Sequence, residues 1–234
     1  AETKRLANEP SASPPVPLGP RIVAGEGEHT DNHTIVRILS PYQVCETQFL
    51  AYPPEIRGGV GVETGVDGKG ETFILSYPLL SARAREIRLF TPSGGSKGTI
   101  EGPKELVPPY VVSVGDYSPE LKGEEITITS RYASTSQPSV YLLSLTGKVL
   151  KVFQAPGKNK ENYQREFKLF TKTGGKVDQL FVQNLTAKRA FRLLPQEETT
   201  PVDFHASAIG SRLFDTAYSD RDFNLGGPQR LVST

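Results

Sequence analysis

The sequence predicts an all-β protein, a β-propeller of about five four-stranded blades or a fragment of a larger propeller. Short apolar strands end repeatedly in Gly- and acid-rich turns, and each is followed by a second apolar strand. Equivalent positions in two of the first strands, Val62 and Val112, lie 50 residues apart, which is the length of one blade. The first 200 residues show no sustained helical period.

The expected strands follow one another in units. Unit A covers residues 21 to about 55, unit B 56 to 107 and unit C 108 to 162, and unit D begins near residue 166. The alternation of apolar and polar residues predicts half-buried strands in each unit. They are expected at 22–26, 34–39 and 48–52 in unit A; 60–65, 71–75 and 86–90 in unit B; 110–115, 125–130, 140–144 and 148–153 in unit C; and 166–170, 179–183 and 190–194 in unit D.

Glycine-containing turns join some of these strands. Gly147 lies in the short turn between the last two strands of unit C, where a tight hairpin needs a positive φ. Unit B has a looser counterpart at 91–95. Unit C is therefore the best-formed unit.

The C-terminal stretch fits the repeat least well. Residues 204–209 have the pattern of a further strand, and residues 230–234 resemble a first strand with no second strand after it. This strand either completes the sheet of unit A and closes a ring of about five blades, or the chain is a piece of a longer propeller whose open sheet edges favour oligomers. A two-sheet β-sandwich is the alternative fold, because short alternating strands also suit it.

Composition and charge bound the compartment and the partners. With 36% hydrophobic residues the chain can bury a sizeable core, and 27 basic against 26 acidic residues create no field that would collect nucleic acid or anionic lipid. No apolar stretch approaches the roughly 20 residues that span a membrane. The expected partner is therefore a protein or glycan surface.

The ends of the chain suggest processing. Residues 1–20 are rich in proline and are expected to form a tail or linker, which leaves residues 21–234 as the folded domain. The sequence begins with Ala1 and contains no methionine, which favours an exported product, extracellular or periplasmic. The lone Cys45 permits no internal disulfide and is expected to be a packed or edge thiol.

The repeats resemble a known family. The segment 64–74, Thr-Gly-Val-Asp-Gly-Lys-Gly-Glu-Thr-Phe-Ile, carries the resemblance best, followed by Gly115-Asp116 with the Gly-Glu-Glu-Ile segment at 123–126. This order is similar to the FG-GAP-type repeats of integrin-alpha-like propellers and related secreted bacterial proteins, and it covers about three of the five units. The resemblance implies a propeller fold.

In that family the loop between first and second strands often has the form Asp-x-Asp-x-Asp-Gly and holds calcium. Here Asp67 is the sole Asp between Thr64 and Glu71, and Asp116 is accompanied only by glutamates. Calcium takes six to eight oxygen ligands. Asp67 and Asp116 are thus candidate ligands, but we expect no cofactor and no firmly bound calcium.

A second group of potential ligands lies in unit A. In an extended segment His29, Asp31 and His33 would share one face, and two imidazoles with a carboxylate could bind zinc. No fourth ligand is recognisable nearby, so an ordinary solvated loop is the preferred interpretation.

No catalytic constellation is recognisable. The chain has three histidines and no Gly-x-Ser-x-Gly elbow, so a nucleophile with its base cannot be assigned. We therefore expect a non-catalytic exported module that binds a protein or glycan. The alternative is the propeller portion of a secreted polysaccharide lyase or hydrolase, with acids converging from several blades. A β-sandwich with a structural or adhesive role is the third interpretation.

Overall fold

The computed structural model describes residues 21–133, 139–154, 165–172, 177–185, 189–193 and 200–202. These residues contain sixteen strands and no helix, so the prediction of an all-β protein is confirmed. Nothing in them resembles a helix that could cross a membrane. The expected tail at 1–20 and the expected strands at 204–209 and 230–234 lie outside the described residues.

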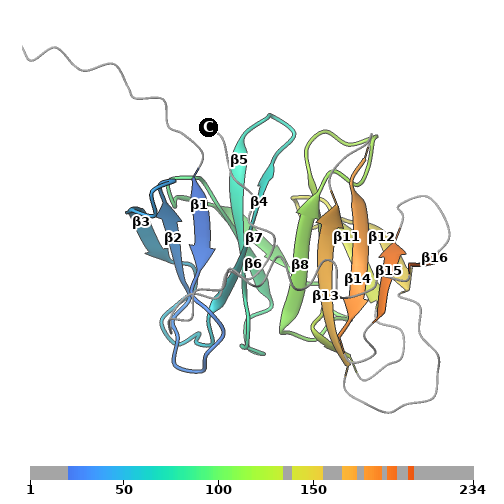
Figure 1. Ribbon diagram of the computed structural model, residues 1–234, viewed down its shortest axis with the longest axis horizontal. Coiled ribbons are helices and arrows are strands. Elements are labelled where there is room, and N and C mark those ends of the chain that lie inside the picture. The colour runs from blue at the N-terminus through green and yellow to red at the C-terminus, as the bar shows by residue number, and fades with distance from the viewer. Residues whose placement is uncertain are drawn as a thin grey trace, which may run out of the picture.

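The strands form four antiparallel sheets that follow one another in chain order (Figure 1), except that the two-residue strand β10 (Tyr132–Ala133) of the fourth sheet precedes the last two strands of the third. The first sheet has the order β1-β2-β3, with β1 (Ile22–Gly25), β2 (Ile35–Leu39) and β3 (Cys45–Leu50). The second has the order β4-β5-β6-β7, with β4 (Val60–Val66), β5 (Thr72–Pro78), β6 (Glu86–Phe90) and β7 (Ser96–Glu101).

The third sheet has the order β12-β11-β9-β8, with β8 (Tyr110–Gly115), β9 (Glu125–Ser130), β11 (Ser139–Leu143) and β12 (Val149–Gln154). The fourth has the order β10-β13-β14-β15-β16, with β10 (Tyr132–Ala133), β13 (Arg165–Lys172), β14 (Gln179–Asn184), β15 (Arg189–Leu193) and β16 (Thr200–Val202). Strands β7, β10 and β16 were not anticipated.

Both predicted turns have the expected geometry. In the second sheet Thr91 N donates to Gly95 O at 2.7 Å, and Gly94 has a φ of 87°. In the third sheet Ser144 N donates to Lys148 O at 2.9 Å, and Gly147 has a φ of 81°. A positive φ of this size favours glycine. Each turn therefore closes a hairpin at the position that the sequence indicates.

The third strand of unit A differs from the prediction of 48–52. The strand begins at Cys45, because Ser40 N donates to Val44 O at 2.9 Å and starts the hairpin earlier. Ala51 and Tyr52 lie beyond its end and are buried. Their burial explains the misplacement, since an apolar pair at the end of a strand resembles strand sequence.

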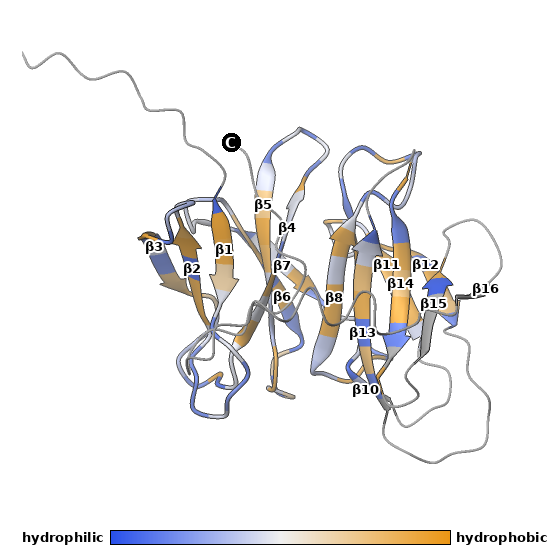
Figure 2. Cartoon of the chain, viewed as in Figure 1, coloured by the Kyte–Doolittle hydropathy of each residue, from blue (hydrophilic) through white to orange (hydrophobic). Residues whose placement is uncertain are grey.

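The core consists of three apolar clusters, and each lies between two successive sheets. One joins Val36 and Ile38 of the first sheet to residues such as Ile74 of the second. The largest joins the second and third sheets, and the last joins the third and fourth. In Figure 2 the apolar residues of the core appear as hydrophobic colour along strands such as β8, whereas several loops between strands are hydrophilic.

Strands in the middle of this arrangement are apolar on both faces. In β11, Tyr141 and Leu143 belong to the cluster shared with the second sheet, whereas Val140 and Leu142 belong to the cluster shared with the fourth. Successive side chains of a strand point to opposite faces. A continuous apolar run thus marks a strand that is covered on both sides.

Candidate functional site

The His29 segment forms a turn rather than the extended strand that the zinc hypothesis assumed. Asn32 N donates to His29 O at 3.0 Å, and His29 Nδ1 lies 3.9 Å from Asp31 Oδ2. His33 instead faces Arg57, whose Nη1 lies 2.7 Å from His33 Nε2. A guanidinium can only donate, so this nitrogen is used as an acceptor. The three side chains therefore do not share one face.

Asp67 is held by its own loop and by a lysine from another strand. Its Oδ1 accepts from the backbone amides of Lys69 and Glu71, both at 3.0 Å, which closes the β4–β5 hairpin. Lys97 of β7 donates to Asp67 Oδ2 at 3.0 Å and to Glu71 Oε2 at 3.1 Å. Burial pushes the pKa of the Asp67 carboxyl upward, but the lysine and the amides outweigh it and lower that pKa overall. A cation of the chain itself thus neutralises the loop.

Asp116 meets a residue that sequence reasoning did not associate with it. Asp116 N donates to Asp178 Oδ2 at 3.0 Å, and Asp178 N donates to Asp116 O at 2.6 Å. These bonds join the end of β8 to the segment before β14. Burial, reinforced by the Asp178 charge, raises the pKa of the Asp116 carboxyl.

Glu125 completes this acidic region from the start of β9. It is only 2% exposed, and its Oε2 accepts from the backbone amides of Tyr117 at 2.8 Å and Ser118 at 3.1 Å. Burial raises the pKa of its carboxyl to about 7, with Asp116 and Glu124 adding to the effect. The side chain thus orders the β8–β9 loop. Across the described ranges, no three His, Cys, Asp or Glu side chains are placed to hold a metal ion.

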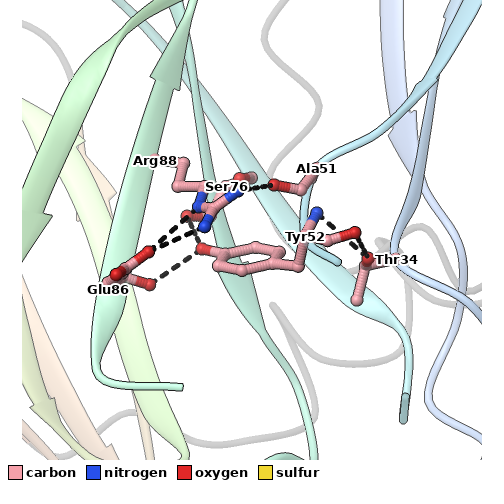
Figure 3. Close-up of polar contacts among 6 residues, drawn as sticks. All are labelled: Thr34, Ala51, Tyr52, Ser76, Glu86 and Arg88. Carbon is pink, nitrogen blue, oxygen red and sulfur yellow. Dashed lines mark hydrogen bonds and ion pairs between the residues drawn. The ribbon is translucent and has the colours of Figure 1, made fainter. Parts of the chain in front are cut away.

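Two further polar groups tie sheets together. Tyr52 donates from its hydroxyl toward the carbonyl oxygens of Ser76 and Glu86, each 2.8 Å away (Figure 3). Arg88 lies over the Tyr52 ring, with its Cζ atom 4.8 Å from the ring centroid, and donates to Ala51 O at 3.1 Å. Burial raises the pKa of the Tyr52 hydroxyl. This group fixes the end of the first sheet against the second.

The second group is centred on Arg131, between the third and fourth sheets. Its guanidinium contacts Glu28 Oε2 at 2.6 Å and Glu166 Oε1 at 2.7 Å, and it reaches Leu79 O at 3.4 Å. These partners come from the β1–β2 loop, from β13 and from the segment after β5. One side chain, from the link between the third and fourth sheets, therefore contacts segments of the first, second and fourth sheets.

The β2–β3 hairpin tip, residues 40–44, carries exposed apolar side chains. Ser40 closes the turn, since Gln43 N donates to Ser40 O at 2.9 Å and Val44 N donates to Ser40 Oγ at 3.2 Å. Gln43 adopts a φ of 62°, a conformation uncommon for a residue other than glycine. Tyr42 is 88% exposed and Val44 63% exposed. The tip thus presents two apolar side chains on an internally hydrogen-bonded turn.

Cys45 lies directly after Val44 and is exposed at the start of β3, the outer strand of the first sheet. Of the two predictions for Cys45, an edge thiol or a packed thiol, the structure agrees with the edge thiol. Its Sγ lies 3.6 Å from Thr47 O. Sequence reasoning did not find the tip, although the Pro-Tyr-Gln-Val run between two strands carried the signal of a turn with an aromatic at its end.

Comparison with known proteins adds little. No family model and no curated protein matches the chain. One solved structure to which it is similar is the crystal structure of the Pseudomonas aeruginosa PilY1 C-terminal domain, with 12% sequence identity and a TM-score of 0.46. The match covers 71% of this chain and 37% of that domain.

Proposed function

We propose that this chain is a non-catalytic, exported module of the β-propeller type that binds a protein or glycan surface through the β2–β3 hairpin tip. The observation that carries the proposal is the exposure of Tyr42 and Val44 on a turn with its own hydrogen bonds. Tyrosine is enriched in binding interfaces, because it offers a large contact area with little conformational freedom to lose. A tyrosine ring also stacks on sugar rings.

The arrangement of the sheets supports the propeller part of the proposal. A two-sheet sandwich has one core between two sheets. Here four successive sheets pack on one another through three apolar clusters, one between each neighbouring pair. Strands β4, β8 and β13, which we call the inner strands, also lie side by side. Gly65 of β4 lies against Val114 of β8, and Ser113 Oγ of β8 lies 2.7 Å from Thr171 Oγ1 of β13. Blades around an axis place their first strands in this way. We further propose that the repeats are of the FG-GAP type.

The exposed thiol next to the tip offers a direct test. An environment-sensitive fluorophore on Cys45 of the full chain would be titrated with a panel of neutral and acidic polysaccharides and of extracellular proteins. We expect at least one panel member to change the emission. Tyr42→Ser with Val44→Ser should weaken that binding about tenfold or more, as loss of an aromatic anchor does.

The matched control is Val149→Ser with Val152→Ser, which changes two exposed apolar residues of β12. This control should bind as the unmodified chain does. Equal binding by the tip variant, or no response to any member of the panel, would overturn the proposal. Export is tested separately by fractionating cells that produce the protein and measuring which fraction contains it.

One observation favours the alternative function, an acid-dependent polysaccharide lyase or hydrolase. Burial raises the pKa of Glu125 to about 7, with the Asp116 and Glu124 charges adding to the effect, and raised carboxyl pKa values occur at catalytic sites. However, Glu125 is buried and bonded to its own loop amides, which suits a structural role better. Release of reducing ends or unsaturated products from a polysaccharide, abolished by Glu125→Gln, would support the enzyme instead.

A further inference from the structure

The first sheet is one strand smaller than the next two. It contains β1, β2 and β3, whereas the second and third sheets contain four strands each. Among the described residues, no strand continues the first sheet beyond β1. The chain direction of β1, compared with the strands of the four-stranded sheets, shows which of the four strand positions is missing from the first sheet.

The inner strands of the other three sheets, β4, β8 and β13, all run in the same chain direction. The end of β4, at Gly65, packs against Val114 near the end of β8, and Ser113 of β8 bonds to Thr171 near the end of β13. β1 runs the opposite way, because its end meets the start of β4: Val60 N donates to Glu26 O at 2.9 Å. The chain direction of β1 is thus that of the second strands β5, β9 and β14, which pair antiparallel with the inner strands. Within the described residues, the strand position missing from the first sheet is therefore that of an inner strand.

The free edge of β1 has the geometry to accept such a strand. Glu26 N donates to Ile35 O at 2.9 Å, which places hydrogen-bonded pairs at Glu26, Ala24 and Ile22 in register with β2. Antiparallel ladders alternate bonded and non-bonded pairs. The backbone N–H and C=O of Val23 therefore point away from β2, toward the position of an inner strand.

We propose that residues 230–234 of this chain form that inner strand, antiparallel to β1. Their sequence, Arg-Leu-Val-Ser-Thr, repeats the pattern of the inner strand β8, where Val111-Val112-Ser113-Val114 has two apolar residues, a serine and a β-branched residue. Reach is no obstacle, since the 27 residues between Val202 and Arg230 can span about 90 Å. This is several times the radius of a domain of this size.

This occupant gives the first sheet four strands and covers the edge of β1. An uncovered edge is a template for pairing with another chain. The proposal concerns the fold and does not rest on binding at the hairpin tip, so each can fail without the other.

Amide hydrogen exchange on the full chain tests the proposal at one residue. The Val23 amide should exchange about 100-fold more slowly in the full chain than in a chain that ends at Gln229. The Ala24 amide, bonded within the first sheet, is the control and should stay protected in both. Rapid exchange of Val23 in the full chain, or equal protection in both chains, would overturn the proposal.

Disulfide trapping identifies the occupant even if the shortened chain unfolds. In a Cys45→Ser background, Ile22→Cys would be combined in turn with Leu231→Cys, Val232→Cys and Ser233→Cys. Non-hydrogen-bonded antiparallel pairs have the Cα separation that a disulfide needs. The proposal requires a disulfide within one molecule for at least one pair and none when Val152→Cys of β12 replaces Ile22→Cys. Disulfides between molecules would assign the edge to a second copy, and their absence would leave β1 unpaired; either result overturns the proposal.

Discussion

Glu28 and Arg131 are 103 residues apart in the chain, yet Arg131 Nη1 donates to Glu28 Oε2 at 2.6 Å. The same guanidinium donates to Glu166 and stacks over Tyr132, whose ring centroid lies 5.2 Å from the Arg131 Cζ atom. Burial lowers the pKa of Arg131, but the two carboxylates outweigh this effect and raise it overall. The bridge fixes the loop after the first strand to the start of the fourth sheet.

Unit C should be sensitive to truncation of its core. Val112 and Ile126 are 1% and 0% exposed and belong to the cluster between the second and third sheets. Val112→Ala or Ile126→Ala should lower the free energy of unfolding by roughly 2–4 kcal/mol, because each leaves a cavity. Urea denaturation measures this loss. Val149→Ala, at an exposed position of β12, is the control, and a loss below about 0.5 kcal/mol at both buried sites would contradict their packing.

Stability should fall as pH rises through neutrality because of Glu125. Its pKa is about 7 when folded and near 4.5 when unfolded, so the folded state holds a proton that the unfolded state releases between these values. The protonated form stabilises fully below pH 4.5, and this contribution is lost as pH rises through 7. Between pH 5 and pH 8 the Tm should fall by roughly 5–10 °C more in the unmodified chain than in Glu125→Gln.

Glutamine retains an oxygen that can accept from the amides of Tyr117 and Ser118, so the variant should fold. Glu101→Gln, at an exposed position of β7, is the control for loss of a surface charge. Identical pH profiles for the unmodified chain and Glu125→Gln would show that this carboxyl does not titrate in the interval.

Calcium should change the Tm by less than about 1 °C. Lys97 already bonds to both Asp67 and Glu71 and offsets part of their negative charge, and Asp116 lies against Asp178 without the set of oxygens that calcium takes. A site present at 100 times its Kd would instead add about 2.7 kcal/mol. The measurement is the Tm from thermal melts, compared between samples with calcium and samples with a chelator. A rise of several degrees that Asp67→Ala or Asp116→Ala abolishes would refute this expectation.

The strand pattern was largely predictable, because it depends on local alternation and turn chemistry. The run at 140–144 and the Gly147 turn indicated β11 and its hairpin to β12. β7 escaped prediction because Ser96–Glu101 exposes five of its six residues and contains one buried apolar side chain, Ile100. A short edge strand with so little apolar sequence gives no periodic signal.

The polar contacts between sheets could not be predicted from the sequence. Lys97 with Asp67, Asp116 with Asp178 and Glu28 with Arg131 are each brought together by the stacking of whole sheets. Their sequence separations follow no rule comparable to strand alternation. A different cause applies at His29 and His33: the segment forms a local turn instead of the extended strand that the zinc hypothesis assumed, and His33 faces Arg57.

We infer that Arg131 joins the first sheet to the rest of the molecule through Glu28. A double-mutant cycle with Glu28→Ala and Arg131→Met, measured by urea denaturation, tests it most directly. Arg131→Met alone should cost about 2–4 kcal/mol by leaving two carboxylates without their donor, whereas Arg83→Met, at an exposed position, should cost almost nothing. We expect a coupling energy of about 1–3 kcal/mol between Glu28 and Arg131. Additive losses, with coupling below about 0.5 kcal/mol, would contradict it.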